Sequence, residues 1–205
     1  MKGKKFLAGL LAGLSVVLGS WGLVACGGTD SSPASSSGLN SSEDAQPKGV
    51  VYEIVDDTAQ VVGYEGTDET VVIEATYNGV AVTKIADNAF KNCEFTSVES
   101  PDSVTEIGNS AFYGCRALES VEIPDSVVSI GLRAFSMCDS LTSIVIGESV
   151  DSIGDAVFDG ANALSSVAFN GSKSKWKKIE KDTFTWWTIK VPTDKVVCLD
   201  GEEDL

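Results

Sequence analysis

The sequence has no histidine and few basic residues. Without histidine it can form neither a Ser-His-Asp nor a Cys-His nucleophilic pair, and it lacks the commonest neutral-pH base and the commonest zinc ligand. Acidic residues outnumber basic residues by 30 to 15, which leaves a net charge of -15. A surface this acidic repels phosphate backbones, so nucleic acid is a poor partner. The composition therefore predicts a non-enzyme with no catalytic residue, metal ion or cofactor.

A long apolar run lies at the N-terminus. Three lysines in residues 1–5 precede a stretch rich in Leu, Ala, Gly and Val at residues 6–24, the pattern of an export signal. The stretch ends in Leu-Val-Ala-Cys, with the cysteine at Cys26, and this tetrapeptide resembles the lipobox of bacterial lipoproteins. The resemblance implies a diacylglyceryl thioether on Cys26 and cleavage before it, so residues 1–25 are expected to be a signal peptide. A plain transmembrane anchor is the alternative, because about 19 apolar residues nearly span a bilayer.

Residues 26–48 are rich in Ser, Gly, Asp and Pro, with Leu39 as their one bulky apolar side chain. Such a segment buries too little surface to offset its ordering entropy, so we expect a flexible tether.

Two acyl chains anchor a protein stably to a membrane without spanning it. The N-terminus thus predicts a protein of the bacterial cell envelope that is held to a membrane by lipid and faces away from the cytoplasm. Whether that envelope has one membrane or two stays open.

Four copies of one unit follow each other within residues 83–170. Their isoleucines are separated by 22, 23 and 23 residues, and their phenylalanines keep the same steps. The two series are Ile85, Ile107, Ile130 and Ile153, and Phe90, Phe112, Phe135 and Phe158. Inside a unit, Leu118, Val121 and Ile123 follow L-x-x-V-x-I, an alternation typical of a short strand with inward apolar side chains. One such coil cannot bury its apolar face, but stacked coils can, so the pattern predicts a solenoid.

The order AF-x-x-C, followed by L-x-x-V-x-I-P-x-S-V-x-x-I-G, resembles the BspA-type leucine-rich repeat, a family of bacterial and protist surface proteins. The resemblance implies a mainly β fold with short helical turns: a leucine-rich-repeat-type solenoid of about four 22–23-residue coils with a cap at each end. Residues 49–82 would be a β-rich N-terminal cap, residues 83–170 the repeats and residues 171–205 a C-terminal cap. The family also implies a non-catalytic cell-surface protein that binds a protein or another macromolecule, or adheres to cells. The ligand and the oligomeric state stay open.

Cys93, Cys115 and Cys138 occupy one position in three successive units and should form a column in the core, although the fourth unit has Ala161 there. Coils roughly 4.7–4.9 Å apart bring such cysteines within disulfide range. Parallel side chains fit the disulfide dihedral badly, however, and buried cysteine is a good apolar filler, so we favour free thiols over a disulfide. No CxxC pair exists to complete a zinc site. The first unit is one residue short between Cys93 and Val98.

Two outward columns on the predicted strands form the candidate binding face. They are Ser97, Ser120, Ser143 and Ser166, and Glu99, Glu122, Val145 and Ala168. Partners usually dock on the exposed face of a solenoid, and the acidic-to-apolar order from Glu99 to Ala168 predicts a strip for a basic or mixed protein surface. The alternative is an unselective solvated face. Glu99 and Glu122 could in principle act on a glycoside, but nothing around them indicates a cleft or a raised pKa.

An aromatic and basic cluster follows the repeats. It consists of Trp176, Trp186 and Trp187 beside Lys173, Lys175, Lys177, Lys178 and Lys181. We expect the tryptophans to cover the last coil while the lysines protect its edge from pairing with another chain. The alternative is a site for sugar or an anionic polymer, which would make the protein a cell-wall or glycan-binding module.

Overall fold

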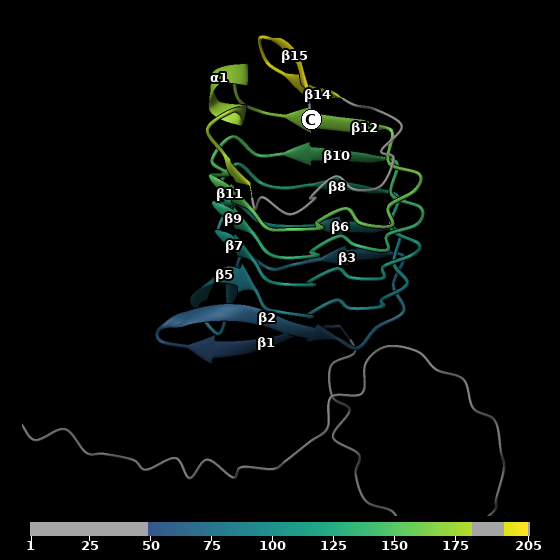
Figure 1. The fold of residues 1–205 in the computed structure, drawn as a ribbon. Coiled ribbons are helices and arrows are strands. Elements are labelled where there is room, and N and C mark those ends of the chain that lie inside the picture. Colours follow the sequence, from purple (N-terminus) through teal and green to yellow (C-terminus); the bar gives the residue numbers. More distant parts are fainter. Residues whose placement is uncertain (1–48, 182–194, 205) are drawn as a thin grey trace, which may run out of the picture.

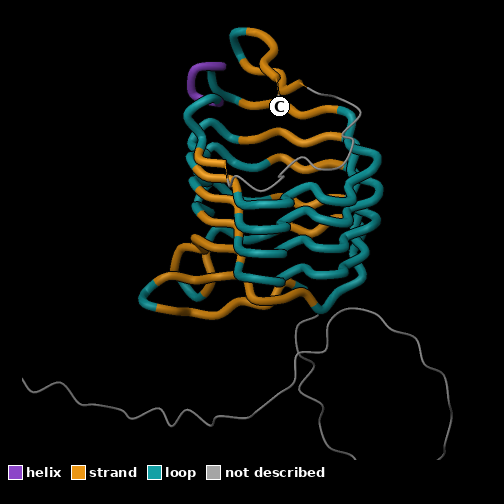
Figure 2. The backbone as a smooth tube through the Cα atoms, in the orientation of Figure 1, coloured by secondary structure: helices purple, strands orange, loops and turns teal. Residues whose placement is uncertain are grey.

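The computed structural model describes residues 49–181 and 195–204, whose strands stack into a solenoid (Figure 1). Strands and loops alternate around each coil (Figure 2). The mainly β solenoid predicted from the sequence is confirmed. The predicted signal peptide and tether lie outside the described residues, and so do Trp186 and Trp187.

The first ladder is a sheet that begins with a hairpin and continues as parallel rungs. Its strands lie in the order β1-β2-β5-β7-β9-β11-β13, and β4 pairs with β5. The strands are β1 (Val50–Val55), β2 (Thr58–Tyr64), β4 (Thr76–Tyr77), β5 (Val80–Ile85), β7 (Glu106–Ile107), β9 (Ser129–Ile130), β11 (Ser152–Ile153) and β13 (Glu180–Lys181). The hairpin turns at Asp56 and Asp57, whose φ angles of 47° and 64° suit the tight turn between twisted antiparallel strands. From β2 to β13 every pairing along this path is parallel.

The second ladder contains the predicted L-x-x-V-x-I strands. Its strands are β3 (Thr70–Val72), β6 (Ser97–Glu99), β8 (Ser120–Glu122), β10 (Ser143–Ile146), β12 (Ser166–Phe169), β14 (Lys195–Cys198) and β15 (Gly201–Asp204). The strands β8, β10, β12 and β14 pair in parallel, and β15 pairs antiparallel with β14. At the other end β3 pairs in parallel with β6, which lies beside β8. The ladder therefore extends beyond the predicted repeats, by β3 at one end and by β14 and β15 at the other.

The chain between the ladders bends through consecutive turns. In the first unit the N–H of Ala89 donates to Ala86 O, and the N–H of Cys93 donates to Phe90 O. In each unit the residue two positions before the phenylalanine has a positive φ, and so does the residue two positions after it. The residues before the phenylalanine are non-glycine in all four units. These residues are Asn88, Ser110, Arg133 and Ala156. The one helix within the described residues is α1 (Lys173–Trp176), which begins after the N-cap residue Ser172.

The predicted isoleucine and phenylalanine columns lie in the core, each side chain at most 3% exposed. The rings of Phe90, Phe112 and Phe135 stack at centroid distances of 5.0 Å, with interplanar angles of 10° and 5°. Phe158 continues the stack at 6.0 Å. The N–H groups of Phe90, Phe112 and Phe135 also donate to the next coil, as from Phe112 to Ala134 O at 2.8 Å. Coil-to-coil stacking of identical groups therefore builds one continuous core.

The short first unit is accommodated by a larger side chain. Phe95 stands where the next units have Leu118 and Leu141, and it is 1% exposed. Its ring makes edge contacts with Phe90 at 5.5 Å and with Tyr64 at 5.9 Å. The missing backbone residue is thus offset by an aromatic ring that also joins the N-terminal strands to the repeats.

Trp176 lies at the opposite end of the core. It is 1% exposed, and its ring lies 5.3 Å from that of Phe169 on β12. The helix α1 brings it there, and Ile179 just beyond the helix is also buried. Trp176 therefore extends the core past the last of the four predicted units.

Candidate binding surface

The two predicted outward columns lie on the second ladder, on strands β6, β8, β10 and β12. All eight side chains are exposed or half-buried, whereas the residues between them, such as Val121 and Ile144, are buried. In-register pairing sets Ser143 between Ser120 and Ser166, and Val145 between Glu122 and Ala168. Parallel hydrogen bonding thus holds the columns straight from β8 to β12, whereas β6 belongs to a separate two-stranded sheet with β3 and lies beside β8.

Each end rung adds residues to these columns that sequence reasoning missed. Pairing of β3 with β6 places Thr70 beside Ser97 and Val72 beside Glu99, and the two hydroxyls lie 2.9 Å apart. Pairing of β12 with β14 places Val197 beside Ala168. Val72 and Val197 are 52% and 51% exposed. The short apolar runs at residues 71–73 and 196–198 were the available signal, but neither segment keeps the 22–23-residue spacing.

The face combines uncompensated acid with apolar surface. Neither Glu99 nor Glu122 makes an ion pair or a side-chain hydrogen bond within the described part of the chain. Beyond them along the same column lie Val145, Ala168 and Val197. We call the strip from Glu99 to Val197 the graded strip. It presents negative charge at one end and apolar side chains at the other.

A hollow of about 310 Å³ opens between the ends of β6 and β8. It is lined by Val98, Glu99, Ser100, Asp102, Glu122 and Pro124. The sequence around the two glutamates does not indicate this hollow. The physical reason for the hollow is Ser100, a small residue at the position where the adjacent rung carries Ile123. We call this hollow the Ser100 recess.

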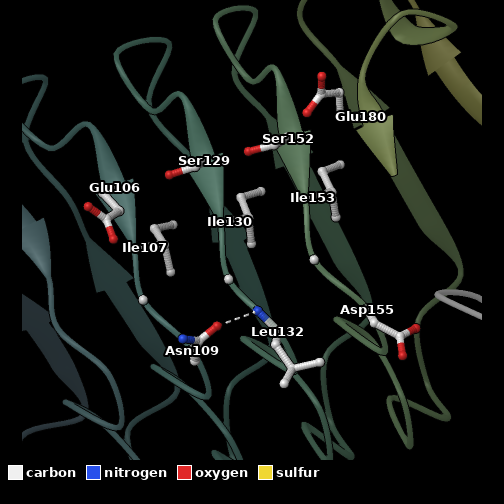
Figure 3. Close-up of a pocket in the computed structure, with 13 residues that line it drawn as sticks. Glu106, Ile107, Asn109, Ser129, Ile130, Leu132, Ser152, Ile153, Asp155 and Glu180 are labelled. Carbon is white, nitrogen blue, oxygen red and sulfur yellow. Dashed lines mark hydrogen bonds between the residues drawn. The ribbon is translucent and has the colours of Figure 1, made fainter. Parts of the chain in front are cut away.

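A second, larger groove of about 550 Å³ runs across the first ladder (Figure 3). One side carries Glu106, Ser129, Ser152 and Glu180, and the other carries Asn109, Leu132 and Asp155. Glycines form its floor. A larger residue would clash at Gly131, because a Cβ there would lie 2.6 Å from the backbone nitrogen of Asn109 in the preceding coil. Asn109 Oδ1 accepts the Leu132 N–H at 2.9 Å, and Glu106 is paired with Lys84 at 2.8 Å. Several polar groups of the groove therefore have structural partners already.

The column of Cys93, Cys115 and Cys138 is buried, and its three cysteines are thiols and not half-cystines. The Cys115 and Cys138 thiols donate to the carbonyls of Phe90 and Phe112, at 2.9 and 3.2 Å. Burial raises the pKa of Cys138 to about 12. No group of three metal-binding side chains occurs among residues 49–181 and 195–204. The column therefore has the geometry of core filler.

Only part of the aromatic and basic cluster lies within the described residues. Trp176 is buried in the core, and Lys177 forms an ion pair with Glu203 of β15 at 3.0 Å. The other two tryptophans lie outside the described residues.

In the described part of the chain, no helix has the length and apolarity needed to cross a bilayer.

Parallel rungs, a 22–23-residue period and an exposed ladder define the class of leucine-rich-repeat solenoids. The model of the BspA type leucine rich repeat region matches residues 83–192 in 6 copies. This match covers more than half of the chain, so the chain belongs to the BspA-type leucine-rich repeat family. The predicted family is thereby confirmed.

Solved structures of similar proteins agree with this assignment. The T. pallidum leucine rich repeat protein is 32% identical, with a TM-score of 0.57 over 62% of this chain and 60% of its own. A leucine rich cell surface protein from Faecalibacterium prausnitzii is 29% identical, with a TM-score of 0.56 over 65% of this chain and 41% of its own. A leucine-rich repeat protein from Bacteroides ovatus is 32% identical, with a TM-score of 0.54 over 61% and 35%. This chain spans less than two thirds of each. No curated protein matches the sequence at a significant level.

Proposed function

We propose that this protein is a non-catalytic cell-surface lipoprotein that binds a protein ligand, as in adhesion, through the graded strip. The likeness to a cell surface protein of F. prausnitzii supports the location, and the lipobox-like sequence at Cys26 supports the anchor. Repeats of this family are typically non-catalytic, which supports a role in binding.

The observation that carries this proposal is the set of exposed, in-register columns on a rigid parallel ladder. On β8, β10 and β12, backbone hydrogen bonds between rungs fix the spacing of these side chains before any ligand arrives, so little conformational entropy is lost on binding. Val145 and Ala168 supply apolar contact, and Glu99 and Glu122 supply charge that attracts a basic partner.

Lipid anchoring would add to this binding. A protein held at a membrane meets a ligand on a neighbouring surface at high effective concentration, so many weak contacts give strong overall attachment. The predicted tether would supply the reach for such encounters.

The test compares two charge-reversed variants of the mature chain. We expect Glu99→Lys with Glu122→Lys to lower the capture of ligand from envelope and host-surface extracts at least tenfold, measured by quantitative mass spectrometry. The matched control, Glu65→Lys with Glu94→Lys, makes the same change of charge at two exposed positions away from the strip. Equal capture by both variants would contradict the proposal, because net charge alone would then explain the result.

A further inference from the structure

The Ser100 recess is the one interruption of an otherwise filled column. At the position of Ser100, the other rungs carry large or apolar side chains that close the end of the strand, all of them buried. These are Ile73, Ile123, Ile146, Phe169 and Cys198. Serine is too short to fill this space, so the hollow of about 310 Å³ opens to solvent beside it.

The burial of neighbouring residues agrees with this origin. Val98 and Val121, the inward residues of the two strands beside the recess, are 7% and 6% exposed. The equivalent Ile144 and Val167, farther along the ladder, are each 1% exposed. The opening therefore exposes part of the apolar core at this place.

Three carboxylates surround the opening, from Glu99, Asp102 and Glu122. All three residues are exposed, and none of the three side chains has an ion pair or hydrogen bond within the described residues. Val98 and Pro124 add apolar surface to a lining that also includes Ser100. A ligand group that fits must be cationic at its tip and apolar along its stem.

We propose that the Ser100 recess takes an arginine side chain of the protein partner. This inference rests on the proposed function and names the chemistry of the ligand at that site. The guanidinium group meets the carboxylates of Glu99, Asp102 and Glu122, and its planar fork can engage a carboxylate through two hydrogen bonds. Its methylene stem packs against Val98 and Pro124.

The rest of the graded strip fits the same partner. The recess lies beside the acidic end, and Val145 and Ala168 continue away from it on the next rungs. A protein surface with one arginine beside an apolar patch would cover both. Arginine in a pocket flanked by apolar contacts is a common centre of binding energy at protein interfaces.

The decisive perturbation is Ser100→Ile. It gives this rung the residue that adjacent rungs already carry, so it narrows the recess beside Val98 and Pro124 and removes no carboxylate. We expect the variant to fold with an unchanged or higher melting temperature. The control, Ser140→Ile, adds the same side chain at an exposed position on a different turn.

The probes are the peptides acetyl-Gly-Arg-Gly-amide and its citrulline counterpart, which has nearly the same shape and no charge. Each is titrated against the full chain in deuterated detergent and followed by saturation-transfer NMR. We expect the arginine peptide to bind at least fivefold more tightly than the citrulline peptide. Ser100→Ile and Glu122→Gln should each weaken arginine-peptide binding at least fivefold, and Ser140→Ile should not change it.

Equal binding of the two peptides, or arginine binding that survives both Ser100→Ile and Glu122→Gln, would overturn the arginine pocket. If that happens while Glu99→Lys with Glu122→Lys still abolishes ligand capture, the graded strip remains the binding surface and only the pocket is refuted. Should Ser100→Ile fail to fold, Glu122→Gln decides the question alone.

Discussion

The phenylalanine stack offers a quantitative test of the repeat packing. Phe112 is 1% exposed and lies between Phe90 and Phe135, with both centroid distances at 5.0 Å. Phe112→Ala would remove a buried ring and leave a cavity, at a cost of about 3–5 kcal/mol. Because each stacked aromatic pair contributes about 0.5–1.5 kcal/mol beyond its burial, we expect a loss in the upper part of that range, about 4–5 kcal/mol.

The assay is urea unfolding of the chain without its predicted signal peptide, followed by circular dichroism. With an m value of about 2 kcal/mol per M, a loss of about 4 kcal/mol lowers the urea midpoint by about 2 M. Phe158→Ala should cost less, about 3 kcal/mol, because the ring of Phe158 lies 6.0 Å from that of Phe135, farther than the 5.0 Å between Phe112 and each of its neighbours.

The neighbouring Tyr113 provides the control. Its side chain is half-buried and lies under the Lys91 ammonium group, 5.4 Å from the ring centroid. Tyr113→Ala should therefore cost only about 1 kcal/mol. If Phe112→Ala cost no more than Tyr113→Ala, the continuous aromatic core would not be the element that holds the coils together.

Three further outcomes are expected. The four cysteines of residues 49–205 should be unreactive to Ellman's reagent at pH 8 in the native state and all reactive in urea, because all four are buried in the fold. For Cys138, burial also raises the pKa to about 12, so its reactive thiolate stays scarce at pH 8. Gly131→Ala should destabilise the fold by about 1–3 kcal/mol, because the new Cβ would lie 2.6 Å from Asn109 N. The control Gly63→Ala, whose Cβ would make an ordinary contact of 3.8 Å with Val51, should change the urea midpoint little. Cys26→Ser should move the protein from the membrane to the soluble fraction and abolish labelling by an alkynyl fatty acid; retention at the membrane without label would favour the transmembrane alternative.

The sequence by itself determined the repeat and the direction of its side chains. A period of 22–23 residues marks one coil, and alternation within a strand is a local property of extended backbone, so Val121 and Ile123 could be assigned inward without a structure. The column of cysteines follows from the same register. These features depend only on spacing along the chain, which the sequence displays directly.

Only the tertiary structure decided where the ladder ends. Thr70 pairs with Ser97 at a separation of 27 residues, and Ala168 pairs with Val197 at a separation of 29. Loops of irregular length hide these rungs from a search for a constant period. Their strands join the ladder because backbone hydrogen bonds and buried side chains align them in space, whatever the length of the connecting loop.

The Ser100 recess likewise depends on three-dimensional packing. The sequence displays a serine where the next unit has isoleucine, but it cannot tell whether a neighbour fills the space. Phe95 compensates for a missing residue elsewhere in the same unit, whereas beside Ser100 a hollow remains. Cavities are decided by the side chains of adjacent coils together, so they belong to the tertiary structure and not to any single repeat.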